Sequence, residues 1–121
     1  MSTLPDHFSK LVIHQLTGDF RSSTSVTTQA WVDPGPGEVV VRNRWAGCNA
    51  IFDKNLCRNS IRYVDVKPPY DMGIEAVGEI VKLGPGVTGW ALGDAVATTR
   101  LGSGYREYQV ADTSRLVRVR E

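Results

Sequence analysis

Glycine-rich turns divide this chain into short segments, and they constrain its fold more than any other feature of the sequence. Four of them are Pro34-Gly35-Pro36-Gly37, Gly84-Pro85-Gly86, Gly93-Asp94 and Gly102-Ser103-Gly104. Glycine and proline interrupt regular structure, and the segments between these turns are short and rich in β-branched residues. This pattern favours a mainly β fold, a barrel or a sandwich, over a sheet whose strands alternate with helices.

The segments between the turns read as strands. We predict strands over residues 10–16, 39–45, 75–83, 95–99, 105–110 and 115–119. Gly78 lies inside the third of these, and a glycine there indicates a bend or the close approach of another backbone. The polar stretch from Arg21 to Gln29 fits either a short pairing strand or a loop.

Only one segment has clear helical spacing. Between Asn49 and Ser60, Phe52 and Leu56 lie one helical turn apart, which predicts a helix of two to three turns. Because 121 residues allow one ordinary domain with a core, we expect a single domain over residues 1–121. It should be mainly β, with one or two short helices.

Charge and apolar content exclude several classes of partner. The sequence has 14 Lys and Arg residues and 13 Asp and Glu residues. Positive and negative charges therefore nearly balance, and nothing favours nucleic acid or an anionic membrane as a partner. Apolar runs such as residues 11–13 are too short to cross a bilayer, and the sequence shows no secretory signal. Cys48 and Cys57 form no disulfide framework or zinc-ligand spacing. We therefore expect a cytoplasmic protein.

Several short motifs follow one another in an informative order. They are Pro-Gly-x-Gly-Glu-Val at 34–39, Ala46-Gly47-Cys48-Asn49, Pro68-Pro69, Gly73 to Val81, Gly84-Pro85-Gly86-Val87, Gly93-Asp94-Ala95-Val96 and Tyr105-Arg106-Glu107-Tyr108. Together they resemble the GroES-like catalytic domain of medium-chain dehydrogenases/reductases, over residues 10–119. Residues 41–50 and 66–73 look closest to the quinone oxidoreductase and prostaglandin reductase-3 (zinc-binding alcohol dehydrogenase domain-containing protein 2) branch. The resemblance implies a partly open β-barrel.

Zinc distinguishes the branches of that superfamily. In its alcohol dehydrogenases, this domain supplies a Cys and a His to a catalytic zinc, whereas Asn49 and Ile74 stand at those positions here. An amide and an isoleucine cannot replace a thiolate and an imidazole. The lobe of four cysteines that binds a structural zinc in those enzymes is also missing. We expect neither zinc site.

The resemblance implies chemistry that needs no metal. Members of this branch reduce an activated alkene or a quinone with NADPH, and hydrogen bonds stabilise the developing enolate oxygen. The family asparagine corresponds to Asn49, whose amide would donate to the cofactor or to the substrate oxygen; the alternative is that Asn49 only caps the following helix. Tyr63 lies where related reductases often place a tyrosine that serves as a proton or hydrogen-bond donor. The alternative is a surface loop tyrosine.

Two acidic positions complete this comparison. The family aspartate soon after the asparagine has no clean counterpart, because Phe52 stands at that spacing and Asp53 follows it. Glu75 matches a glutamate near the floor of the active site, and a buried carboxylate there would need a partner.

Three further residues are expected to pack rather than to react. Cys48 is adjacent to the ligand position and is expected to be a small buried apolar residue. Tyr70 and Trp45 are expected to fill the core or a loop rather than to stack on a substrate.

The sequence lacks a segment that would bind NADPH. Gly84-Pro85-Gly86 and Gly102-Ser103-Gly104 are not followed by a helix, so no Rossmann-type pyrophosphate turn is present. In one interpretation the chain is the truncated substrate-side domain of an NADPH-dependent quinone or enone reductase (alkenal or 15-oxo-prostaglandin-like substrates), inactive alone. In the other it is a free-standing binding or assembly module. A homodimer, or a separate Rossmann domain, would cover its exposed apolar face.

Overall fold

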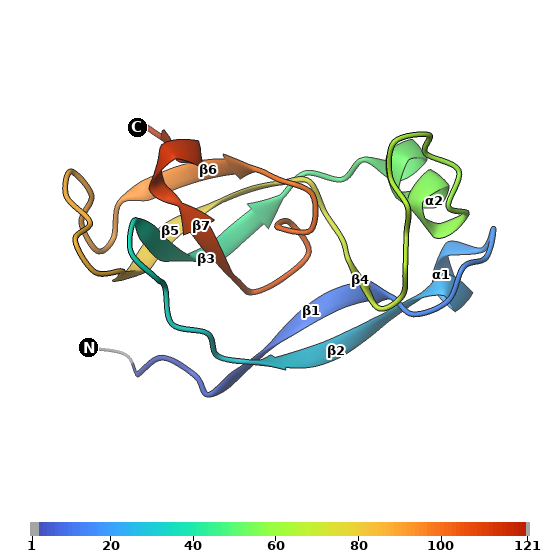
Figure 1. Cartoon of the computed structure of the whole chain (residues 1–121), viewed down its shortest axis with the longest axis horizontal. Coiled ribbons are helices and arrows are strands. Elements are labelled where there is room, and N and C mark those ends of the chain that lie inside the picture. Colours follow the sequence, from blue (N-terminus) through green and yellow to red (C-terminus); the bar gives the residue numbers. More distant parts are fainter. Residues whose placement is uncertain (1–2, 121) are drawn as a thin grey trace.

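Two antiparallel sheets form the chain in the computed structural model, which describes residues 3–120 (Figure 1). One sheet has the order β2-β1-β4, and the other has the order β7-β3-β5-β6-β8. The strands are β1 His7–Ile13, β2 Thr24–Ala30, β3 Glu38–Ala46, β4 Tyr70–Asp71, β5 Glu75–Leu83, β6 Ala95–Thr99, β7 Tyr108–Asp112 and β8 Val117–Arg118. The predicted mainly β, partly open barrel is confirmed, and a Rossmann domain is absent from the described residues.

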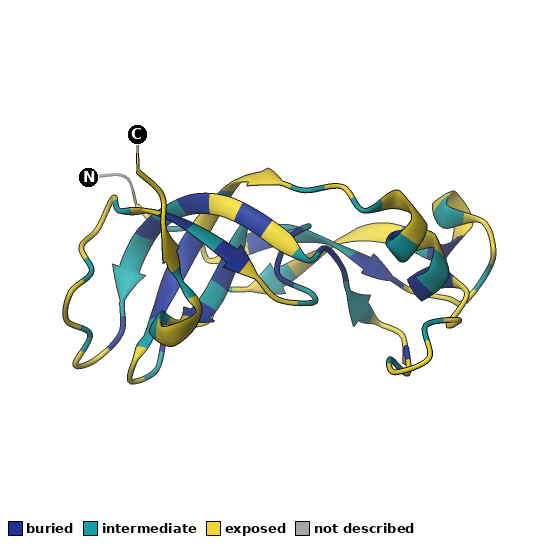
Figure 2. Cartoon of the chain, turned by 90° about the horizontal axis from the view of Figure 1, so that it is seen from above, coloured by how far each residue is buried: buried dark blue, intermediate teal, exposed yellow. Residues whose placement is uncertain are grey.

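The five-stranded sheet holds one of two hydrophobic cores. β3 lies between β5 and β7. The core side chains of this sheet belong to β-branched or small residues. The core residues are Val39, Val41, Ile80, Val96 and Ala111. In β3 three successive valines, Val39 to Val41, are buried. Figure 2 shows buried positions alternating with more exposed ones along β5, β6 and β7. This period of two is what an antiparallel sheet with one buried face requires.

Gly78 allows β3 and β5 to approach closely, as the sequence predicts. A Cβ atom at this position would overlap the carbonyl group of Arg42 on β3. The pairing of the two strands also shifts register between Asn43 and Trp45, opposite this glycine. The close approach therefore coincides with a bulge that bends β3.

The three-stranded sheet packs on the helices and forms the second core. Its buried members are Ile13, Leu56, Cys57, Val66 and Met72. The stretch from Arg21 to Gln29 adopts both regular conformations: the helical turn α1 (Phe20–Ser23) precedes β2, which pairs with β1 along its whole length. The strand interpretation of this stretch is thus confirmed for its second part.

The predicted helix is α2 (Ala50–Cys57). It lies with α1 at one end of the molecule, away from the end formed by β6 and β8 (Figure 1). The short 3-10 helix η1 (Thr113–Arg115) precedes β8. None of the helices in residues 3–120 has the length and apolar character needed to cross a membrane.

Some predicted boundaries were wrong. Strand β7 begins at Tyr108 rather than at Tyr105, because residues 102–105 pass close to Gly73 and bond to the main chain of Met72 and Gly73 instead. A Cβ atom on Gly73 would overlap the main chain of Gly104 and Tyr105. This close crossing fixes Tyr105 beside the first core, next to α2.

Candidate functional site

Asn49 lies immediately before α2. Its main-chain oxygen accepts a hydrogen bond from the N–H of Asp53 at 2.8 Å, so the helix begins here. The Asn49 backbone has φ −118° and ψ 72°, and its side chain makes no capping hydrogen bond. Capping therefore does not occupy the amide group, whose two donors and one acceptor are available for a ligand.

A buried pair, Asp53 and Tyr105, stands beside Asn49. The Asp53 side chain is only 5% exposed, and its Oδ2 accepts a hydrogen bond of 2.5 Å from the Tyr105 hydroxyl. The other oxygen, Oδ1, is buried and has no hydrogen-bond partner among residues 3–120. The pair ties the first turn of α2 to the loop that precedes β7.

Sequence reasoning missed this pair, although one signal was available. Asp53, Leu56 and Cys57 follow the i, i+3, i+4 spacing of one helix face, and all three are buried. The spacing therefore placed the carboxylate on the apolar face of α2. No comparable signal was available for Tyr105, because its contact with Asp53 joins residues far apart in the chain.

Burial changes the acidity of both partners. Desolvation raises the pKa of the Asp53 carboxyl above its ordinary value, and the hydrogen bond from Tyr105 partly opposes this shift. The pKa of Tyr105 is raised by burial first, then by the hydrogen bond to Asp53 and by its charge. Tyr105 is therefore held as a neutral hydrogen-bond donor near pH 7, and its role here is to position α2.

An apolar cavity of about 480 Å³ lies next to this pair. It is lined by Leu11, Phe20, Cys48, Ala50, Asp53, Lys54 and Tyr105. Its walls come from β1, α1 and the start of α2. Asn49 is not itself a lining residue, but its two neighbours in the sequence, Cys48 and Ala50, are. An apolar wall with a few converging polar groups is typical of a site for a small organic molecule.

The prediction that Cys48 is buried was wrong. Cys48 was expected to be buried, but it is exposed and lines the apolar cavity, whereas Cys57 is fully buried in the core. The reason is that residues 47–49 form the connection from β3 to α2, and only α2 itself packs in the first core, through Leu56 and Cys57.

Tyr63 is not brought into the same cavity. Its side chain is 84% exposed and lies on the segment between α2 and β4, where residues 59–65 line a separate shallow groove. Among the described residues, therefore, Asn49, Asp53 and Tyr105 form a cluster, and Tyr63 stands apart from it.

An exposed face adjoins the site at the end of β3 and the start of β5. Trp45 is 77% exposed, so the expectation that it packs in the interior is wrong, whereas Tyr70 packs against the first core as expected. Val77, paired with Trp45 across the two strands, is also exposed. Glu75 lies on the same rim with its carboxylate against Gly47, and it is exposed rather than buried. It therefore carries no desolvation cost.

No group of three or more His, Cys, Asp or Glu side chains within residues 3–120 is arranged to hold a metal ion. Ile74, at the position of the family histidine, precedes β5 with a partly buried side chain.

The fold is a partly open antiparallel barrel, with the short helix α2 beside an apolar cavity. Residues 35–121 match the family described as "Alcohol dehydrogenase GroES-like domain", which is most of the chain. The chain belongs to this family.

Similar proteins are oxidoreductases by name. The chain is 38% identical over 118 residues to a probable quinone oxidoreductase of Leishmania amazonensis, covering 97% of this chain and 34% of that protein. It is 35% identical over 116 residues to prostaglandin reductase-3 of Mus musculus, covering 93% and 30%. The chain spans about a third of the length of these relatives.

A solved structure shows the same fold. Escherichia coli quinone oxidoreductase, crystallised with NADPH, superimposes with a TM-score of 0.76 at 21% identity, over 93% of this chain and 33% of that one.

Proposed function

We propose that this chain is the substrate-side domain of an NADPH-dependent reductase of quinones and enones, and that it is inactive alone. The observation that carries the proposal is the Asn49 amide, which is not used for capping and whose two neighbours in the sequence, Cys48 and Ala50, line an apolar cavity. Relatives named quinone oxidoreductase and prostaglandin reductase-3 support the substrate class.

The described residues do not fit a complete NADPH site. All strand pairings are antiparallel, and no glycine-rich turn between a strand and a helix is present in residues 3–120 to hold a pyrophosphate. NADPH bound to another domain would supply a hydride to the β-carbon of the substrate. The work of this chain is to bind and orient that substrate.

The Asn49 amide would stabilise the negative charge that develops on the substrate during the reduction. As the alkene is reduced, negative charge develops on the carbonyl oxygen, and an N–H donor placed at that oxygen stabilises it. The Asp53–Tyr105 pair holds the first turn of α2, and the main chain of Asn49 is bonded to this turn through the N–H of Asp53. Tyr63 would donate a proton or a hydrogen bond only when substrate and a second domain cover it.

The exposed face formed by Trp45 and Val77 supports a partner domain in the working enzyme. Exposed apolar side chains that pair across two strands beside a site are typical of a surface that another domain covers. Because Trp45 and Val77 are apolar, this face favours a domain that is covered by a partner over a free-standing module. The cytoplasm remains the compartment that we propose.

The test measures two ligands on the 121-residue chain. We expect no NADPH binding by the fluorescence of the cofactor, but weak binding of cyclohexenone, detected by NMR shifts around Asn49. The N49A variant should lose the enone shifts, whereas N55A, at a residue of α2 that does not line the cavity, should retain them. Micromolar NADPH binding by the native chain would contradict the proposal, because it would require a nucleotide site in this domain.

A further inference from the structure

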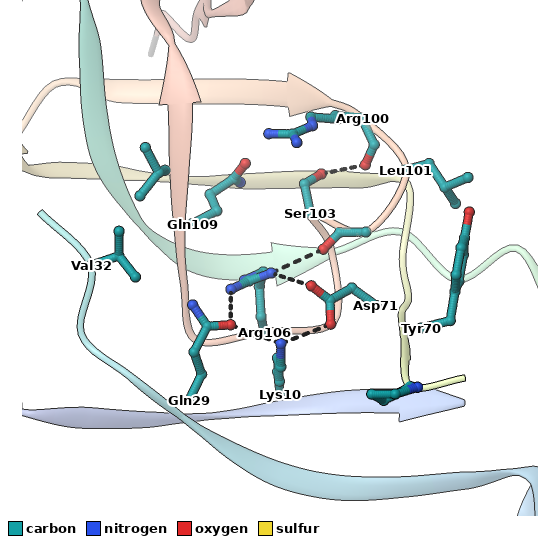
Figure 3. A pocket seen from close by; sticks show the side chains of 13 residues that line it. Lys10, Gln29, Val32, Tyr70, Asp71, Arg100, Leu101, Ser103, Arg106 and Gln109 are labelled. Atoms are coloured by element: carbon teal, nitrogen blue, oxygen red, sulfur yellow. Dashed lines mark hydrogen bonds and ion pairs between the residues drawn. The ribbon is translucent and has the colours of Figure 1, made fainter. Parts of the chain in front are cut away.

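A second cavity, of about 580 Å³, lies between the two sheets (Figure 3). Its charged and amide side chains come from widely separated parts of the chain. They are Lys10 of β1, Gln29 of β2, Asp71 of β4, Arg100 and Arg106 of the loop before β7, and Gln109 of β7. The volume is in the range of small-molecule sites.

A hydrogen-bonded network forms one side of this cavity. Lys10 Nζ lies 2.9 Å from Asp71 Oδ1, and Arg106 Nη1 lies 3.0 Å from Asp71 Oδ2. The Asp71 carboxylate therefore forms an ion pair with each of the two cations. Gln29 Oε1 accepts from both, at 2.8 Å from Lys10 Nζ and 2.9 Å from Arg106 Nη2. The network is rigid and mostly shielded, because the Lys10 and Arg106 side chains are 17% and 13% exposed.

The cavity carries excess positive charge. Asp71 neutralises only one of the two cations that it contacts, and Arg100 lines the cavity without any side-chain hydrogen bond or ion pair to residues 3–120. Figure 3 shows Arg100 on the opposite side of the cavity from Lys10, Gln29 and Arg106. The lining therefore has a formal charge of +2, from three cations and one carboxylate, which disfavours a cationic ligand and favours an anion.

Part of the wall is apolar. Val32, Tyr70 and Leu101 contribute to the lining, and in Figure 3 Tyr70 and Leu101 stand together at one side. A bare inorganic ion would leave the exposed parts of these side chains in water, whereas an organic anion would bury more of their apolar surface. The guanidinium of Arg100 offers parallel donors that match a carboxylate.

This cavity is distinct from the one beside Asn49. Lys10 and Arg106 form an isolated β-bridge, and their neighbours Leu11 and Tyr105 line the other cavity. Successive side chains of an extended segment point to opposite sides, so one wall of backbone separates the two cavities.

We propose that this second cavity binds an organic carboxylate, with its carboxylate on Arg100 and its apolar body against Tyr70 and Leu101. The site does not depend on the reductase function, because it uses none of the residues around Asn49.

The experiment titrates the chain with hexanoate and with hexanol, which share the apolar body. We expect hexanoate to bind at least about tenfold more tightly, since a charge-assisted pair is worth that factor or more. NMR shifts should concentrate on the Arg100 Nε–H and the main-chain amide of Leu101, because both residues line the cavity where the ligand is placed. R100Q should abolish the preference for hexanoate, whereas R21Q, at an exposed arginine of α1, should not change it.

Two results would overturn the proposal. One is equal affinity for hexanoate and hexanol, which would show that the charge is not used. The other is a preference for hexanoate that survives in R100Q or that is accompanied by shifts away from this cavity. Because the Arg100 side chain is exposed and makes no hydrogen bond or ion pair with residues 3–120, R100Q should fold normally, and the NMR spectrum of this variant provides the check.

Discussion

The Tyr105 hydroxyl donates a hydrogen bond to Asp53 Oδ2 across 2.5 Å, and this contact joins helix α2 to the loop before β7. Asp53 lies one helical turn after Asn49, so the contact also fixes the residue that we place at the substrate oxygen. The neighbouring Oδ1 lacks any partner among the described residues, which makes the carboxylate sensitive to the loss of its one donor.

Removing that donor should destabilise the fold. Y105F leaves a buried carboxylate without a hydrogen bond, and we expect a loss of about 1–3 kcal/mol in the free energy of unfolding, measured by urea denaturation. Y63F is the matched control, because Tyr63 is largely exposed, and it should change stability by less than about 0.5 kcal/mol. Equal effects of the two changes would show that the contact with Asp53 is not structural.

Asp53 should also make stability depend on pH. The folded-state pKa of its carboxyl lies above the ordinary value of 3.8, so its contribution is fully present below that pH and is lost as the pH rises through the folded pKa. D53N removes this titration. The stability of D53N relative to the native chain should therefore increase between about pH 3 and about pH 7, as measured by denaturant midpoints.

D6N provides the comparison for this pH series, because Asp6 is exposed. D6N should change the stability by less than about 0.5 kcal/mol, as is usual for a surface substitution. A relative stability of D53N that falls with rising pH would mean that the folded protein favours the charged carboxylate.

Local patterns predicted most of the strands, because glycine turns and β-branched runs act within a few residues. β5 and β6 have the predicted bounds of 75–83 and 95–99, and α2 falls inside the predicted helical segment. Gly78 was also interpreted correctly, since a glycine inside a strand has few structural roles.

The site was harder to predict, because its contacts join distant segments. Asn49 was proposed from the resemblance, whereas the Tyr105–Asp53 bond spans 52 residues and the Lys10–Arg106 bridge joins opposite ends of the chain. The exposure of Trp45 and Cys48 could not be derived either, because it depends on where β3 leaves the sheet.

The close approach at Gly78 predicts a severe effect of one added methyl group. In G78A the new Cβ would overlap the Arg42 carbonyl, so β3 and β5 must separate, and we expect a loss of about 1–3 kcal/mol or more. G18A is the control, because a Cβ there meets only the Arg58 side chain at an ordinary 3.5 Å. Thermal unfolding of both variants checks the prediction, and similar melting temperatures would refute it.

The two cysteines should differ in reactivity under native conditions. Iodoacetamide should modify Cys48, which is exposed, and leave Cys57, which is 0% exposed. Mass spectrometry of the native chain should show one adduct, absent from C48S, and two adducts after unfolding in urea. Rapid double labelling of the folded chain would show that α2 does not stay packed on the first core.

The exposed face at Trp45 should make the isolated chain self-associate. Trp45 and Val77 are cross-strand partners that both lie open to solvent, and a second copy can cover them as another domain would. Analytical ultracentrifugation should then show a mass that rises with concentration, and W45S should shift the association to higher concentration by about tenfold. V26S changes an exposed apolar residue on β2, in the other sheet, and should leave the association unchanged. A monomer mass that stays constant at all concentrations would exclude this face as a dimer interface, and equal effects of W45S and V26S would place the association elsewhere.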